Sequence, residues 1–154
     1  MTALVEPDAV VGPQIVAAVR RRLDRGVPTG RPGTPMPDEG RLREVVAEAV
    51  REAGRVLGPS GLDRTVRDVR DELFGAGPLQ RWLDDPAVTD VLVNAPDEVW
   101  VERNGRLERT VTRFASAADV RALAVRLAAS GGQRLDDAAP TVDARLPDGT
   151  RLHA

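Results

Sequence analysis

The chain has 154 residues, of which 42% are hydrophobic, and its 22 basic and 24 acidic side chains give a formal net charge of −2. This length can bury one ordinary hydrophobic core or two small ones, and the near balance of charge argues against a nucleic-acid-binding surface. Cysteine is absent, which excludes a disulfide framework and a thiolate metal site. Every basic residue is an arginine.

The amino terminus lacks the basic and apolar regions of a signal peptide, and no apolar run approaches the roughly 20 residues of a membrane-spanning helix. We therefore expect a soluble protein. The first predicted element is an amphipathic helix over residues 1–25, formed mainly by residues 13–25. Its last turns are basic, which suits anionic lipid or an acidic partner but is explained more simply by the helix dipole.

A flexible linker is predicted over residues 26–40, which are too rich in proline and glycine to pack. A small helical bundle is predicted next, over residues 41–75. It contains one helix over residues 42–56, with Val56 in its apolar stripe, and another over residues 62–73. These stripes are most simply mutual packing surfaces, and docking of a partner protein is the alternative.

The composition changes after residue 75, where a short helix over residues 78–85 is predicted. Three strands are predicted to follow it, over residues 89–94, 98–102 and 106–111. Apolar and polar residues alternate along them, and the Asn104-Gly105 pair is the strongest short-range hairpin signal in the chain. This region is therefore predicted to be an antiparallel meander.

A helix is predicted after Ser116, which forms a capping pattern with Asp119. A terminal hairpin follows, with strands over residues 142–146 and 150–154 joined by a turn that contains Gly149. The predicted fold class is α+β, an N-terminal helical bundle followed by an antiparallel α/β domain with its helices against one sheet. Because the last strand is extended up to its end, we expect the chain to be the front part of something longer.

The predicted core is aliphatic, with few aromatic side chains. We expect Trp100 of the second strand and Leu127 of the last helix to be buried against one another's elements, since their apolar stripes have no other surface to cover.

Catalytic motifs are missing from this sequence. A P-loop requires a lysine that converges with backbone amides on the phosphates, and the chain has no lysine. The single histidine, His153, is most simply a strand residue, and the paired acids of the loops have no spacing suited to acid-base chemistry. We therefore assign no catalytic or metal-ligating residue, and expect no ATPase activity from the chain alone.

Several separate blocks of the sequence resemble the N-terminal region of type II/IV secretion ATPases, most closely the CpaF/TadA branch that drives tight-adherence (Flp) pili. The blocks cover residues 72–79, 83–94, 99–107 and 134–152. Two departures are visible: Ala95 stands where the family commonly has glycine, and the motor core of the family lies beyond Ala154. The resemblance spans about half the chain.

This resemblance implies a hexameric ring in which residues 76–154 form a PAS-like N-terminal domain above a RecA-like C-terminal domain. ATP and Mg would bind between the two domains of the full-length protein. The implied partners are the chain's own RecA-like domain, neighbouring subunits and inner-membrane platform proteins, with no nucleic acid. The implied location is the cytoplasmic face of the inner membrane.

The resemblance also implies that arginines of the N-terminal domain contact the triphosphate. The candidates are Arg134, Arg145 and Arg151. A guanidinium is always charged and forks onto phosphate oxygens, so it suits this role independently of any family. The alternative is that these arginines form surface ion pairs with Asp136, Asp143 or Asp148, where such pairs contribute little. A second hypothesis for the whole chain is a freestanding PAS-like adaptor or sensory module without a motor.

Overall fold

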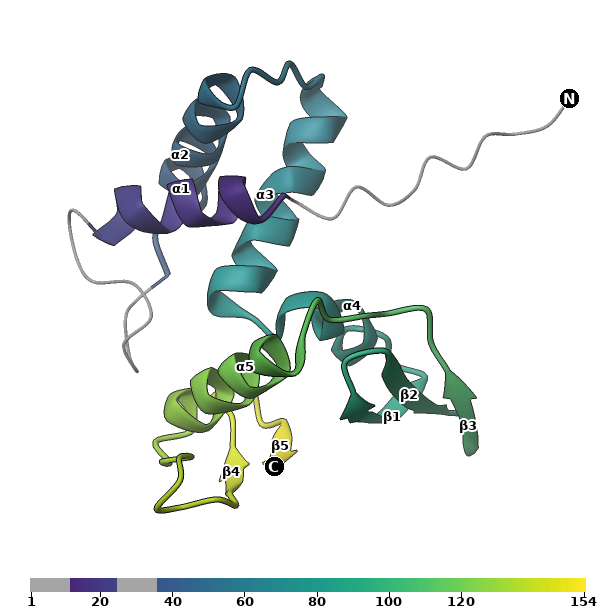
Figure 1. Cartoon of the computed structure of the whole chain (residues 1–154). Coiled ribbons are helices and arrows are strands. Elements are labelled where there is room, and N and C mark those ends of the chain that lie inside the picture. The colour runs from purple at the N-terminus through teal and green to yellow at the C-terminus, as the bar shows by residue number, and fades with distance from the viewer. Residues whose placement is uncertain (1–11, 25–35) are drawn as a thin grey trace, which may run out of the picture. The chain divides into compact units, whose positions relative to one another are not determined.

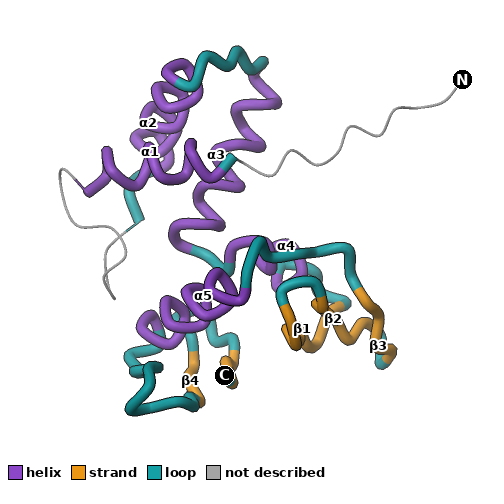
Figure 2. Tube along the Cα trace, viewed as in Figure 1, coloured by secondary structure: helices purple, strands orange, loops and turns teal. Residues whose placement is uncertain are grey.

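The computed structural model describes residues 12–24 and 36–154, which form two compact units, one of residues 12–24 and 36–74 and the other of residues 75–154. Figure 1 follows the chain through both units, and Figure 2 shows that the strands all belong to the second unit. Within the described residues, no helix is long and apolar enough to cross a membrane.

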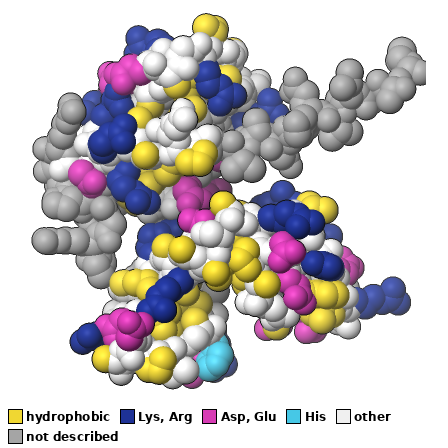
Figure 3. All heavy atoms as spheres, viewed as in Figure 1, with side chains coloured by type: hydrophobic (Ala, Val, Ile, Leu, Met, Phe, Trp, Pro, Cys, Tyr) yellow, Lys and Arg dark blue, Asp and Glu magenta, His cyan; other side chains and the backbone are white. Residues whose placement is uncertain are grey.

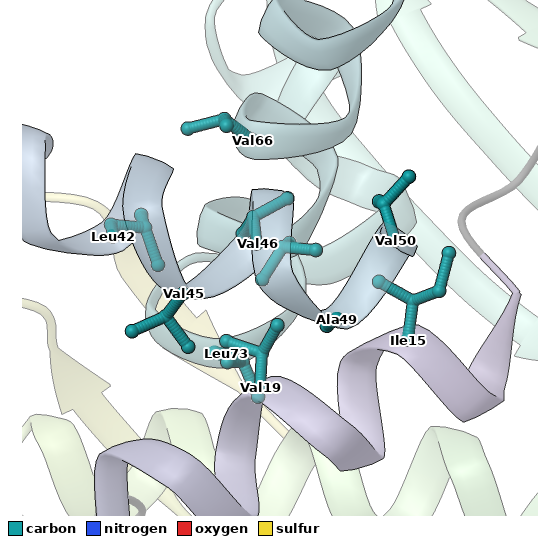
Figure 4. Packing of buried hydrophobic residues seen from close by; sticks show 10 residues of the cluster. Ile15, Val19, Leu42, Val45, Val46, Ala49, Val50, Val66 and Leu73 are labelled. Carbon is teal, nitrogen blue, oxygen red and sulfur yellow. The ribbon is translucent and has the colours of Figure 1, made fainter. Parts of the chain in front are cut away.

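The first unit is a bundle of three helices, α1 (Pro13–Asp24), α2 (Glu39–Glu52) and α3 (Pro59–Phe74). Each contributes an apolar stripe to one core, and Figure 4 shows these side chains converging between the helices. The most deeply buried members are Val19, Leu42, Val45, Val46 and Val69. The periodicity of the sequence therefore predicted a true packing surface in each helix.

Helix α2 begins and ends with recognisable caps. The side chain of Asp38 accepts a hydrogen bond from the backbone N–H of Arg41 at 2.9 Å, so the helix begins inside the predicted linker of residues 26–40. The remainder of that linker, up to residue 35, lies outside the described residues. At the other end Gly54, with φ +70°, allows the backbone N–H of Arg55 to bond to the carbonyl of Val50 at 3.1 Å.

Because of this glycine, the prediction that α2 continues to Val56 is wrong: the helix ends at Glu52, and Val56 is 98% exposed. Helix α3 then begins at Pro59, earlier than predicted, because proline fits the first turn of a helix, where no intrahelical N–H partner is needed. Arg22 of α1 forms ion pairs with Glu48 and Glu52 of α2 and adds a polar contact beside the core.

The second unit begins with a short 3-10 turn, η1 (Gly77–Leu79), and one helical turn, α4 (Gln80–Leu83). The predicted antiparallel meander follows as β1 (Val88–Ala95), β2 (Glu98–Arg103) and β3 (Arg106–Arg109), in the order β1-β2-β3. Asn104 and Gly105 both have positive φ, 51° and 74°, as a type I′ turn requires. The hairpin signal in the sequence is thus confirmed.

The core of this unit lies on one face of the meander, against α4, η1 and α5 (Ala117–Ser130). Val99 and Val101 of β2 are 0% and 1% exposed and define the inner face, and Leu127 packs against the same core. Trp100 is only partly buried and points to the opposite face, opposite Leu92, which is 42% exposed. The expectation that Trp100 packs against the helices is therefore wrong, because alternation along β2 gives that face to the two valines.

Trp82 of α4, rather than Trp100, links separate elements of this unit. Its indole Nε1 donates a hydrogen bond to the hydroxyl of Thr112 at 2.9 Å, and Thr112 is buried. The guanidinium groups of Arg81 and Arg103 lie 4.6 and 5.6 Å from the centre of its ring. The segment after β3 is thereby fixed to α4 by a polar contact between two residues far apart in sequence.

Helix α5 is capped as predicted: the hydroxyl of Ser116 accepts a hydrogen bond from the backbone N–H of Asp119 at 3.2 Å. The terminal hairpin consists of β4 (Asp143–Arg145) and β5 (Arg151–His153). These two strands form a sheet of their own, separate from the meander, so the prediction of one sheet is wrong. The α+β fold class is confirmed, a helical bundle followed by a unit of helices and antiparallel sheets.

Candidate functional site

The β4–β5 hairpin is a tight and regular unit. Backbone hydrogen bonds join Val142 to Ala154 in both directions, at 2.8 and 3.0 Å, and the N–H of Leu146 donates to the carbonyl of Thr150 at 2.8 Å. Gly149 takes φ 92° in the turn, and the carboxylate of Asp148 accepts from the N–H of Thr150 at 2.9 Å. Glycine is needed here because other residues adopt this left-handed conformation at a cost.

The two faces of the hairpin differ in chemistry. Val142 and Leu146 are buried, at 6% and 8% exposure, and Ala144 is partly buried between them. The other face is exposed and carries four ionisable side chains, Asp143, Arg145, Arg151 and His153. The strand alternation therefore sorts the apolar residues toward the protein and the ionisable residues toward solvent.

The end of helix α5 sets the position of the hairpin. The helix ends at Ser130, and Gly131 lies so close to the hairpin that a Cβ atom there would be 2.9 Å from the Cβ of Ala144 and 3.1 Å from the carbonyl oxygen of Arg145. Only a residue without a side chain allows this approach. The backbone of one candidate arginine is thus held directly against the last turn of α5.

Arg145 and Arg151 are opposite one another in the hairpin register. In an antiparallel hairpin, opposite residues alternate between pairs that exchange backbone hydrogen bonds and pairs that do not. Because Val142 and Leu146 belong to hydrogen-bonded pairs, Arg145 and Arg151 form a non-hydrogen-bonded pair, in which the two side chains lie closer together. Within residues 12–24 and 36–154, neither arginine forms a hydrogen bond or ion pair through its guanidinium. Two like charges directly opposite are unfavourable by themselves, so this pair is suited to an anion that neutralises both.

Arg134 is placed differently from the other two candidates. It lies in the loop between α5 and β4 and forms an ion pair with Asp136, as the alternative interpretation of the arginines anticipated. This hydrogen bond to Arg134 lowers the pKa of the Asp136 carboxyl, with backbone N–H groups of Ala138 and Ala139 adding to the effect. The structure therefore brings Arg145 and Arg151 together and gives Arg134 a partner of its own.

His153 has a contact that the sequence did not reveal. Its Nδ1 lies 3.0 Å from a carboxylate oxygen of Asp143, its cross-strand neighbour on the exposed face. The histidine side chain, cyan in Figure 3, is 78% exposed. The signal was available in principle, because residues 143 and 153 are equally distant from the turn and therefore opposite one another.

The described residues contain no group of three or more histidine, aspartate or glutamate side chains that could hold a metal ion. By themselves they do not build a magnesium site. The exposed hairpin face instead carries the two guanidinium groups of Arg145 and Arg151 beside Asp143 and His153.

A family model described as type II/IV secretion system protein matches residues 72–154, more than half of the chain. This chain belongs to the type II/IV secretion system protein family. The matched region is the second unit and the last residues of α3, and it includes all three candidate arginines. The resemblance proposed from the sequence is thereby confirmed at the level of the family.

Among individual relatives of this secretion-family chain is a protein of Mycobacterium tuberculosis named "Putative conjugal transfer protein". It is 45% identical over 105 residues, which cover 64% of this chain and 30% of the relative. The type IV secretion system protein VirB11 of Brucella suis is 35% identical over 79 residues, covering 51% of this chain and 22% of VirB11. The chain therefore spans less than a third of the length of these curated relatives.

A crystal structure of the VirB11 ATPase from the Brucella suis type IV secretion system, in complex with sulphate, also matches. The TM-score is 0.46 and the sequence identity 36%, over 49% of this chain and 23% of the VirB11 chain.

Proposed function

We propose that this chain is the N-terminal region of a secretion ATPase that clamps the nucleotide and couples its hydrolysis to partner proteins. The observation that carries the proposal is that Arg145 and Arg151 are cross-strand neighbours whose guanidinium groups have no partner among the described residues, inside the region that matches the secretion family. In this proposal the ATP-hydrolysing P-loop belongs to a RecA-like domain outside the chain, because the chain itself has no lysine.

The role of each arginine follows from its geometry. Arg145 and Arg151 project from the same face of a short hairpin held against α5, so the two backbone positions from which the guanidinium groups extend are fixed opposite one another. Each can donate charge-assisted hydrogen bonds to phosphate oxygens. ATP and Mg, when bound, supply the reactive phosphoryl group and its neutralising cation, and these two residues bind the triphosphate and offset its developing charge.

Arg134 is a weaker member of this proposed site, because its guanidinium is already occupied by Asp136. A nucleotide would have to compete with that carboxylate. We propose that Arg134 acts only if domain closure displaces Asp136.

At a finer level, we propose the CpaF/TadA branch, a hexameric ring, and coupling to inner-membrane platform proteins at the cytoplasmic face of the membrane. Membership in the type II/IV secretion family supports this assignment. A chain that acts as a freestanding adaptor would bind its partner with no involvement of ATP turnover.

The test is ATP turnover by the full-length protein with Arg145→Ala or Arg151→Ala. Loss of one charge-assisted hydrogen bond is worth about 1.5–3 kcal/mol, so kcat/KM should fall about tenfold to hundredfold. Arg145→Lys and Arg151→Lys should restore only part of the activity, because an ammonium group cannot reproduce a bidentate fork. Melting temperature and oligomer size should stay at wild-type values.

Arg106→Ala is the matched control, since Arg106 is an exposed strand arginine of the other sheet. It should leave turnover unchanged. Wild-type turnover in both hairpin alanine variants would refute the proposed nucleotide role. Lost turnover together with a lower melting temperature would instead assign the arginines to stability of the hairpin.

A further inference from the structure

Asp143 lies within reach of two arginines on the exposed face of the hairpin but contacts a histidine instead. Its carboxylate lies on the same strand face as Arg145, two residues away, and diagonally across from Arg151. Such positions are within reach of a long side chain. Yet the carboxylate of Asp143 contacts His153, at 3.0 Å, and within the described part of the chain it forms no ion pair with either arginine.

Nearby carboxylates behave in the opposite way. Asp136 pairs with Arg134, two residues from it, and Asp137 pairs with Arg121 of α5. A carboxylate beside an arginine on this surface is thus taken up by that arginine unless another group holds it, as the backbone N–H of Thr150 holds Asp148 in the turn. His153 is the feature that distinguishes Asp143 from the other two.

We propose that His153 keeps the Arg145–Arg151 pair available to an oligophosphate by holding the carboxylate of Asp143, and that protonation of His153 increases the affinity of this face for the phosphate. This inference rests on the proposed function and adds to it a regulatory pair, Asp143 and His153, beside the clamp. The oligophosphate is the triphosphate of a nucleotide.

Both parts of the inference follow from the charges on the face. With His153 neutral the four side chains carry a net charge of +1, and with His153 protonated they carry +2. A unit charge about 7 Å from one unit of negative charge in water changes the affinity about threefold, and screening by salt keeps the effect on a multiply charged phosphate of the same order. Release of Asp143 toward the arginines has an effect of similar size.

The charged groups that face His153 are on the hairpin itself: Asp143 across from it, Arg151 on its own strand, and Arg145 diagonally. Helix α5 lies against the opposite face, where Gly131 approaches Ala144. Two arginines of α5, Arg121 and Arg126, contact Asp137 and the backbone carbonyl of Gly75, respectively.

The experiment measures binding of tripolyphosphate to the 154-residue chain by NMR, from amide and arginine Nε–Hε shifts, at pH 6 and pH 8. At pH 8, His153→Ala should weaken tripolyphosphate binding about threefold, because the released Asp143 carboxylate competes with the phosphate for the two arginines. The double variant Asp143→Asn/His153→Ala lacks this competing carboxylate and should bind tripolyphosphate as tightly as the wild type or more tightly. Between pH 8 and pH 6 the wild-type affinity should rise about threefold more than that of His153→Ala, which reports the titration of the phosphate alone.

Asp90→Asn, on an exposed position of β1 in the other sheet, is the matched control and should have no effect. Cross-strand contacts between residues 144 and 152 show in each variant whether the hairpin is intact. ATP should bind as tripolyphosphate does; a face that takes tripolyphosphate but not ATP would overturn the assignment to nucleotide.

The binding measurements distinguish a failure of the regulatory pair from a failure of the proposed arginine clamp. If Arg145→Ala and Arg151→Ala abolish binding while His153→Ala changes nothing at either pH, the regulatory pair is refuted and the clamp stands. If the arginine variants bind tripolyphosphate like the wild type, the clamp fails, and the inference built on it fails as well.

Discussion

Gly131→Ala is the substitution that most directly tests how the arginine hairpin is held. The added Cβ would lie 2.9 Å from the Cβ of Ala144 and 3.1 Å from the carbonyl oxygen of Arg145, and neither atom is the end of a flexible side chain. Gly131 has φ −83° and ψ 9°, and this negative φ is open to alanine, as at the third position of many turns, so the effect reports mainly the contact.

The expected magnitude combines two opposing terms. Inserting a methyl group into a close contact costs about 1–3 kcal/mol, and replacing glycine by alanine returns about 0.4–1 kcal/mol by restricting the unfolded chain. The net loss of stability of the second unit is then between about 0 and 2.6 kcal/mol, and we expect a value near the middle, about 1.3 kcal/mol. The hairpin should also move away from α5, which would disturb the spacing of the arginine pair relative to the rest of the unit.

The assay is denaturant unfolding followed by tryptophan fluorescence, because both tryptophans, Trp82 and Trp100, belong to the second unit. Gly61→Ala in α3 is the control: its Cβ would meet Leu57 at an ordinary 3.5 Å, so it should stabilise its helix by about 0.5–1 kcal/mol, seen by circular dichroism. A Gly131→Ala chain that is as stable as the wild type, with unchanged amide shifts over residues 142–154, would refute the close contact.

Three further predictions concern the same unit. Trp82→Phe should cost about 1–3 kcal/mol because it leaves a buried threonine hydroxyl without its donor, whereas Trp100→Phe, whose indole bonds a glutamate that is still partly exposed to water, should stay within about 0.5 kcal/mol; equal losses in denaturant titrations would contradict this. Ser116→Ala should cost about 1 kcal/mol in the same titration, through the lost cap of α5, and no loss would mean that the cap is dispensable. Arg134→Ala should raise the pKa of the Asp136 carboxyl, measured by carbon NMR. Because that pKa is lowered in the folded chain, the ion pair stabilises the fold at pH values above the ordinary aspartate pKa, and this stabilisation is lost as the pH falls through the lowered pKa. An unchanged titration of the Asp136 carboxyl in the variant would contradict the pairing.

The sequence predicted the elements whose signals are local. The Asn104-Gly105 turn and the Ser116 cap depend on residues within a few positions of each other, and both occur as expected. At the end of α2 two local signals conflict: the apolar stripe continues to Val56, whereas Gly54 stops the helix, and the structure follows the glycine.

Other features depend on contacts that periodicity cannot express. The alternation of residues along β2 predicts that the strand has two different faces, but it does not predict which face packs against the helices. The prediction therefore placed Trp100 on the wrong face. The bond between Trp82 and Thr112 joins residues 30 positions apart. In the candidate site, the sequence placed Arg145 and Arg151 on the two strands of one hairpin, and the structure adds that they are directly opposite one another. The ion pair of Arg134 with Asp136 was only an alternative, and the contact of His153 with Asp143 was not predicted.

The meander has two outer strands, and each limits unwanted association with another chain. Strand β1 shows register irregularities near both ends, between Val88 and Asp90 and between Val93 and Ala95, which interrupt a flat row of backbone donors and acceptors. Strand β3 is only four residues long and three of them are charged. Short, charged or irregular edges are poor templates for strand addition, so this sheet should resist the edge-to-edge aggregation to which small antiparallel sheets are prone.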